Sequence, residues 1–192
     1  MGKRVLVILG HPSNDSFCAG LAKAYIESAS AAGHEVRHLR LGELEFDPIL
    51  HEGYKRVQVL EPDLVEAQAA IEWAEHLCVV CPVWWGSVPA LLKGFLDRVF
   101  LPGFAFSYRA GAIFPDQLLK GRSADIIVTM DTPPWYFKWG YRMPAIHQLR
   151  KTTLEFCGIR PVRVRAFGAL RDASEAQRQQ WLSSARGLAE RI

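Results

Sequence analysis

Residues 5–17 read VLVILGHPSNDSF, an apolar run that changes abruptly into glycine, proline and small polar residues. A continuous apolar run without alternation predicts a buried strand from about Arg4 to Leu9. The residues that follow, 16–32, predict a helix that stops at Gly33, a residue type favoured at helix C-termini. A buried strand that leads directly into a helix is typical of an α/β domain.

The same alternation continues to the end of the chain. Four more strands are predicted at residues 34–39, 76–81, 124–130 and 162–167, four more helices at 62–74, 89–100, 141–157 (kinked at Pro144) and 174–191, and an irregular insert at 101–119. Alternating strands and helices, with continuous apolar runs among the strands, predict a three-layer α/β/α domain with a parallel sheet. Five strands suggest the doubly wound order 2-1-3-4-5. Such sheets bind ligands beyond the carboxyl ends of their strands, which selects the loops after Leu9, Cys81 and Met130.

The composition is that of a single globular domain spanning residues 1–192, with 49% hydrophobic and 22% charged residues. The net charge is only +3 and no block of like charge occurs, which disfavours nucleic-acid binding. No stretch approaches the roughly 20 apolar residues of a membrane span. The histidines show no metal-ligand spacing, so no metal site is predicted.

Cys78 and Cys81 have the C-x-x-C spacing found in redox pairs and metal sites. They lie in a predicted strand, however, where residues three apart point to opposite faces. We therefore interpret them as two separate buried thiols. Free thiols are typical of a reducing compartment, so the predicted location is the cytoplasm.

The first candidate loop, residues 10–17, connects the first strand to a helix. Backbone amides at a helix N-terminus bind phosphate groups. Ser13, Asn14 and Ser16 add short side-chain donors, and His11 could pair with a phosphate. Asp15 is expected to point away from an anion and to cap the helix. The alternative interpretation is a capped strand-to-helix turn that binds no ligand.

The second candidate loop directly follows the central strand and contains Pro82, Val83, Trp84, Trp85 and Gly86. Two bulky aromatic side chains at the carboxyl edge of a sheet offer a flat apolar wall for a planar ring. The backbone amides of this loop could bind carbonyl and nitrogen atoms of that ring. The alternative is a hydrophobic plug between the loop and the insert.

The third candidate loop contains Thr129, Asp131 and Thr132, and the densest aromatic cluster of the chain follows at residues 135–141. This cluster is compatible with a lid over a ring-shaped substrate, a dimer interface or a membrane-surface patch. His147, in the next predicted helix, is a candidate donor of a proton or hydrogen bond. A single histidine on a helix is equally compatible with a packing or surface role.

A longer stretch resembles a known family. It reads PVWWGSVPALLKGFLDRVF at residues 82–100 and GFAFSY at residues 103–108. It is similar to the P-x-x-W-x-x-x-P-A-x-L-K-G-x-x-[DE]-R-V-F block and the following F-A-Y-x-Y-like segment of the flavodoxin-like NAD(P)H:quinone oxidoreductases. Gly10-His11-Pro12, with Ser16 and Phe17 after it, resembles the first flavin-phosphate loop of that family.

One segment departs from the family pattern. Many relatives carry Thr-Thr-Gly-Gly after the fourth strand, where this chain has TMDTP at residues 129–133. The tyrosine and histidine that better-known members place after this motif have only nearby substitutes here. These substitutes, Tyr136, Tyr141 and His147, are the candidate catalytic residues that the resemblance implies.

The resemblance implies a flavin enzyme that transfers a hydride from NAD(P)H to a quinone or similar acceptor by a ping-pong mechanism. The protein then supplies binding, orientation and electrostatics to the cofactor. FMN is favoured over FAD, because the chain has no C-terminal extension that could meet an adenine. Family members are usually homodimers with the active site at the subunit boundary.

Three other functions are compatible with the same fold. One is a flavodoxin that only carries electrons, although such carriers are usually acidic and have a Thr- and Ser-rich phosphate loop. Another is a regulatory subunit of a membrane transporter, similar to the ancillary proteins of potassium-efflux systems. The third is an α/β domain that binds no flavin.

Overall fold

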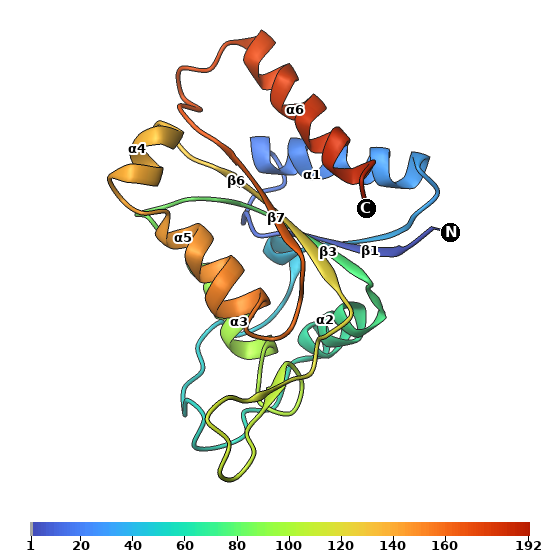
Figure 1. Cartoon of the computed structure of the whole chain (residues 1–192), viewed down its shortest axis with the longest axis vertical. Helices are drawn as coiled ribbons and strands as arrows, with labels where there is room; N and C mark the ends of the chain where they lie inside the picture. The colour runs from blue at the N-terminus through green and yellow to red at the C-terminus, as the bar shows by residue number, and fades with distance from the viewer. Residues whose placement is uncertain (1) are drawn as a thin grey trace.

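The computed structural model describes residues 2–192 (Figure 1). Its main sheet contains β1 (Arg4–Leu9), β2 (Glu35–Arg40), β3 (His76–Pro82), β6 (Ser123–Thr129) and β7 (Val162–Phe167). All neighbouring strands are parallel, and the order is β2-β1-β3-β6-β7. The predicted order is confirmed, because β6 and β7 are the fourth and fifth long strands along the chain.

Helices cover both faces of this sheet (Figure 1). On one face lie α1 (Phe17–Ala31) and α6 (Glu175–Ala189), and on the other lie α2 (Pro62–Trp73) and α3 (Ala90–Val99). Each face carries its own hydrophobic core, so the sheet is buried on both sides. This explains why its central strands read as continuous apolar runs.

The cysteine pair lies in the middle of the sheet. Cys78 and Cys81 are both free and fully buried in β3, and they belong to the cores on opposite faces. Burial raises the pKa of both thiols well above its ordinary value. The interpretation as two separate buried thiols is confirmed.

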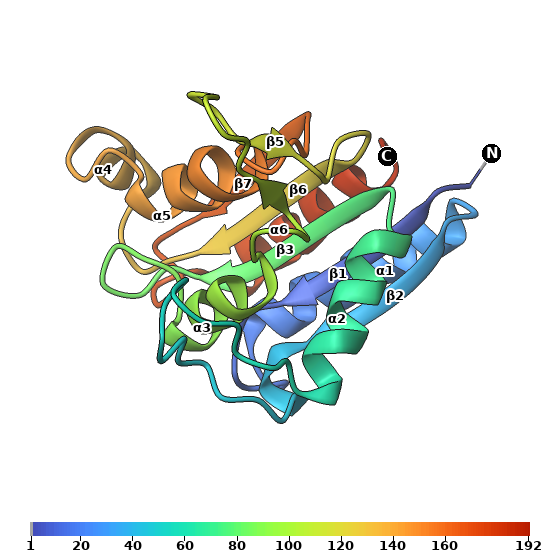
Figure 2. The same cartoon turned by 90° about the horizontal axis from the view of Figure 1, so that it is seen from below.

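The predicted irregular insert at residues 101–119 contains a small second sheet that projects from the main one (Figure 2). In it, β4 (Phe106–Ser107) pairs antiparallel with β5 (Asp116–Gln117). Strands of two residues carry no periodic pattern, so the sequence gives no signal for them. The segment between β2 and α2 begins with a short 3-10 helix, η1 (Leu41–Glu43).

The segment after β6 differs most from the prediction of one helix over residues 141–157. A separate helix, α4 (Pro134–Trp139), comes first and has no counterpart in the prediction. The next helix, α5 (Pro144–His147), continues as a π-helix, η2 (Gln148–Leu154). Arg142 and Met143 have positive φ angles of 59° and 52°, which prevents a helix from starting at residue 141. Proline suits the first turn of a helix, so Pro144 begins α5 instead of kinking it.

The other predicted boundaries agree with the observed ones to within about two residues. Ser174 caps α6, because its hydroxyl accepts a hydrogen bond from the Gln177 amide. Within residues 2–192, no helix is long and apolar enough to cross a membrane. The same residues contain no group of three or more His, Cys, Asp or Glu side chains that could hold a metal ion.

Candidate functional site

Three loops meet at the carboxyl edge of the sheet. The Gly10 amide donates to the Val80 carbonyl at 2.8 Å, which ties the loop after β1 to β3. The Val83 amide donates to the Thr129 carbonyl at 2.7 Å, which ties the loop after β3 to β6. The strand order thus brings together three segments that are far apart in the sequence.

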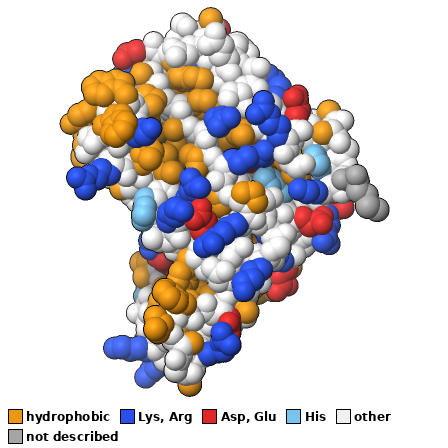
Figure 3. All heavy atoms as spheres, viewed as in Figure 1, with side chains coloured by type: hydrophobic (Ala, Val, Ile, Leu, Met, Phe, Trp, Pro, Cys, Tyr) orange, Lys and Arg blue, Asp and Glu red, His pale blue; other side chains and the backbone are white. Residues whose placement is uncertain are grey.

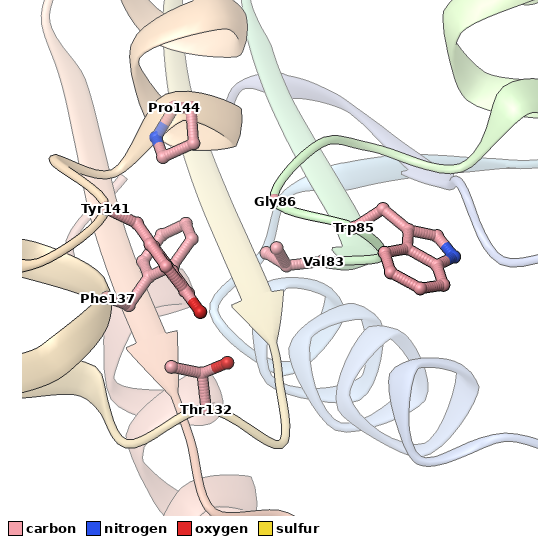
Figure 4. A pocket seen from close by; sticks show the side chains of 7 residues that line it. All are labelled: Val83, Trp85, Gly86, Thr132, Phe137, Tyr141 and Pro144. Carbon is pink, nitrogen blue, oxygen red and sulfur yellow. The ribbon is translucent and has the colours of Figure 1, made fainter.

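A cavity of about 490 Å³ opens between two of these loops and the segment around α4. Its lining residues are Val83, Trp85, Gly86, Thr132, Phe137, Tyr141 and Pro144 (Figure 4). None of these carries a charge, and the volume is within the range of pockets for small organic ligands. In Figure 4 the hydroxyls of Tyr141 and Thr132 point toward each other, and the Trp85 indole extends away from them.

The turn after β3 has an unusual backbone. Trp84 and Ser87 exchange two backbone hydrogen bonds of 2.9 Å, so Trp85 and Gly86 form a two-residue turn. Both have positive φ, 51° and 75°, which is the type I′ pattern that favours Asn-Gly or Gly-Gly. A tryptophan in this conformation costs about 1–2 kcal/mol, and the fully exposed Trp85 indole gains no burial in return. Backbone strain of this kind is concentrated at functional sites.

The two predicted wall residues lie apart. Trp84 is partly exposed and contacts His11 edge-on, with 5.5 Å between the ring centroids. It therefore packs against the first loop and does not line the cavity. Pro82 is the buried last residue of β3 and also lies behind the cavity lining. In this structure the two indoles do not form one flat wall.

The first loop is organised by its own side chains. The His11 ring accepts from the Ser13 amide at 2.9 Å, and the Ser13 hydroxyl accepts from the Asp15 amide at 3.1 Å. The Ser16 hydroxyl accepts from the Ala19 amide at 3.2 Å and caps α1. The prediction that Asp15 caps the helix is therefore wrong. Ser16 has the extended backbone of a cap residue, and its hydroxyl reaches the third amide of the helix.

The start of α1 is suited to an anion. Its first turn contains no acidic side chain that would repel an anion from the positive end of the helix. The amides of Phe17 and Cys18 lie in the first turn, where a helix offers no partner of its own. Burial raises the pKa of the Cys18 thiol to about 11, so no thiolate forms beside these amides near neutral pH.

The third loop places its predicted residues in three different environments. Thr129 is buried, with its hydroxyl 3.2 Å from the Cys18 sulfur, so it faces α1. Asp131 accepts from the Arg171 amide at 3.2 Å and faces the loop after β7. Thr132 is the only one of the three that lines the cavity.

The candidate catalytic residues are also separated. Tyr141 lines the cavity, and Tyr136 packs edge-on against it, with ring centroids 5.0 Å apart. His147 is exposed and lies outside the cavity lining. Phe137 and Pro144 line the cavity and were missed by sequence reasoning. The spacing of these residues gives no signal for a shared face, because Phe137 lies in α4 and Pro144 begins α5.

Comparison with known proteins assigns the family. A family model described as "Flavodoxin-like fold" matches residues 3–188. Mouse ribosyldihydronicotinamide dehydrogenase [quinone] is 30% identical over 208 residues, which covers 95% of this chain and 89% of the relative. The chain belongs to the flavodoxin-like NAD(P)H:quinone oxidoreductase family.

Other members of the family and of the fold are also similar. An uncharacterized NAD(P)H oxidoreductase of Haemophilus influenzae is 30% identical and covers 85% of this chain and 82% of its own. The solved NAD(P)H:quinone oxidoreductase of Methanothermobacter marburgensis is 26% identical, with a TM-score of 0.83 over 99% of this chain and 96% of that one.

Membership in this family confirms three predictions. The fold is flavodoxin-like, the protein is an oxidoreductase enzyme, and it is a flavin-dependent NAD(P)H oxidoreductase.

The residues at the carboxyl edge fit a flavin. Hydrogen bonds within the loop and to β6 already engage the amides of Val83, Trp84 and Ser87. The amides of Trp85 and Gly86 have no acceptor among residues 2–192, so these two can serve a ring heteroatom. The backbone amides of residues 83–86 were all expected to bind the ring. The structure leaves two of them available for this, those of Trp85 and Gly86, and both lie beside an uncharged cavity.

Proposed function

We propose that this enzyme catalyses two-electron reduction of quinones or similar neutral aromatic acceptors, with NAD(P)H as donor and FMN as cofactor. The observation that carries the proposal is the uncharged cavity beside an unopposed helix N-terminus at the carboxyl edge of the sheet. A flat apolar ring with a single anionic tail matches both parts of this site. When bound, the flavin supplies the hydride chemistry.

In the proposed site, α1 holds the flavin phosphate with the amides of Phe17 and Cys18 and the hydroxyls of Ser13 and Ser16. FMN is proposed rather than FAD because the phosphate site is a single helix N-terminus, which matches the one phosphate of FMN.

Tyr141 is the proposed hydrogen-bond donor to the acceptor, because its hydroxyl points into the cavity (Figure 4). Tyr136 is the residue that positions it through their edge-on contact. Thr132 adds a second hydroxyl to the same side of the cavity. His147 receives no role in this proposal, because its side chain lies outside the cavity.

Donor and acceptor are proposed to use the same cavity in turn, which is the ping-pong order.

A homodimer with the active site at the subunit boundary is proposed for a separate reason. Large aromatic or apolar side chains are exposed on α4 and on the insert, and hydrophobic side chains gather on the outer surface in Figure 3. They include Trp135, Trp139, Tyr108, Ile113 and Phe114. A second copy of the chain would cover them.

The proposed location is the cytoplasm, supported by four buried free cysteines.

The test is the visible spectrum of the purified protein, followed by mass analysis of the released cofactor and anaerobic addition of NADPH or NADH. We expect a flavin spectrum, FMN in the mass analysis and rapid bleaching that a quinone reverses. Bound flavin that NAD(P)H does not bleach would indicate an electron carrier. Protein that stays colourless after incubation with FMN would refute the flavin site.

A further inference from the structure

A second cavity, of about 360 Å³, lies at the opposite edge of the sheet from the flavin site. It is lined by the beginnings of β3, β6 and β7, by the N-terminal segment and by the end of α6. The lining residues are Lys3, Glu75, His76, Gly121, Arg122, Ser123, Ala124, Arg160, Pro161, Arg163, Arg191 and Ile192. The family's reaction, at the carboxyl edge, does not use this cavity.

The lining is strongly cationic. Glu75 is its only acidic side chain, and that carboxylate is already 3.3 Å from the Arg4 guanidinium. Arg163 is likewise neutralised, because it forms two hydrogen bonds of 2.6 Å to the buried Asp125. Four other cations line the cavity: Lys3, Arg122, Arg160 and Arg191. Among residues 2–192, no carboxylate lies within salt-bridge distance of any of them.

Part of this charge is fixed in place. The Arg122 guanidinium donates to the carbonyls of Ile71 at 3.2 Å and Glu72 at 2.8 Å, at the end of α2. Carbonyl groups orient an arginine without cancelling its charge. The floor is also fixed, since the Ser123 hydroxyl and the buried His76 ring are 2.7 Å apart.

The positive charge at this edge also affects the neighbouring His34 ring. Burial lowers the pKa of the His34 ring, and the charges of Lys3 and His76 lower it further. In Figure 3, Lys and Arg side chains gather around the C-terminal end of α6. Four cations from separate segments that converge on one concavity repel one another unless an anion is present.

We propose that this cavity binds the phosphoryl group of a small molecule. Arg160 and Arg191 are the exposed cations that contact the anion. Arg122, which the end of α2 holds in place, and Lys3 add positive charge beside them. Guanidinium groups match phosphate oxygens in pairs, which favours a phosphoryl group over a single carboxylate. The concave shape and the volume fit a small molecule better than a nucleic-acid backbone, which needs an extended basic surface.

The test is isothermal titration of the flavin-loaded enzyme with inorganic phosphate and with glycerol phosphate, at constant ionic strength. Loading with flavin occupies the phosphate loop at α1, so a second anion reports on the other cavity. We expect one phosphate per chain, and about tenfold weaker binding in the double variant Arg160→Ala/Arg191→Ala. This loss is about 1.4 kcal/mol, as expected for the removal of two solvent-exposed ion pairs. Tighter binding of glycerol phosphate would identify a phosphorylated metabolite as the ligand, and equal binding would identify free phosphate.

The matched control is Lys23→Ala, which removes one exposed cation on α1, away from this cavity. We expect it to leave phosphate binding unchanged. Both arginine side chains of the double variant are exposed, and the Arg191 carbonyl that bonds Arg163 stays in place, so an unaltered circular dichroism spectrum is expected. Absence of phosphate binding, equal binding by the double variant, or binding of heparin without phosphate would each overturn the proposal.

Discussion

Replacing Trp85 by asparagine should stabilise the flavin-free protein. The tryptophan has a φ of 51° in a two-residue turn, next to Gly86 at 75°. Asparagine tolerates this conformation, and Asn-Gly is the preferred sequence of a type I′ turn. The relief is about 1 kcal/mol, and no hydrophobic burial is lost because the indole is fully exposed. For a domain of this size, 1 kcal/mol raises the Tm by roughly 2–4 °C.

The assay is thermal unfolding of the flavin-free protein together with titration of FMN. The Trp85→Asn variant is expected to melt at a higher temperature, because the turn loses its strain, and to bind FMN more weakly, because the cavity loses the indole that lines it. Trp139→Asn is the control, since Trp139 is also exposed but ends a normal helix, so no gain in Tm is expected. A Tm for Trp85→Asn that is unchanged or lower would refute the argument from strain.

Three further predictions follow from the same geometry. Tyr141→Phe should lower kcat/KM for a quinone about 100-fold if its hydroxyl donates a proton, and His147→Ala should stay within about twofold of the parent in the same steady-state assay. Asp125→Asn should cost about 3–5 kcal/mol of unfolding free energy at pH 7, because it breaks a buried ion pair. Burial raises the pKa of Asp125, but its three hydrogen-bond donors outweigh this and hold it below 3.8. Its contribution is therefore present above about pH 4 and is lost as pH falls further, so denaturant melts should show a shallower acid decline in the variant. Ser87→Ala removes the 3.2 Å hydrogen bond to Gln148 and should cost about 1 kcal/mol in the same melts, and an unchanged midpoint would show that this bond is not stabilising.

The fold was predictable because its strands are buried on both faces. A parallel sheet between two helical layers requires apolar residues at nearly every strand position, and residues 5–9 and 77–81 show this directly. The edge strand β2 has no fully buried residue. Its position beside β1 could nevertheless be predicted from the strand order of this topology. The prediction failed at α4 and α5, where the backbone of Arg142 and Met143 is left-handed and neither residue type signals it.

The site was predictable as a set of loops but not side chain by side chain. Strand order determines which loops meet, so the loops after β1, β3 and β6 could be selected without coordinates. The direction of each side chain depends on local backbone angles and capping bonds. Thr129 and Asp131 therefore turn away from the cavity, while Phe137, in a helix the sequence did not indicate, turns into it.

The two edges of the sheet each contain an arrangement that lowers stability, and each arrangement supports the site proposed there. At the carboxyl edge, a bulky residue occupies a turn position that asparagine or glycine would fill without strain. At the amino edge, four cations share a concavity that a single additional carboxylate would relieve. The sheet requires neither arrangement, because backbone hydrogen bonds between its strands and two apolar cores already stabilise it. Backbone strain and charge repulsion persist only where another interaction compensates for them. A ring bound at the carboxyl edge and an anion bound at the amino edge would provide that compensation. They account for residues that folding alone does not explain.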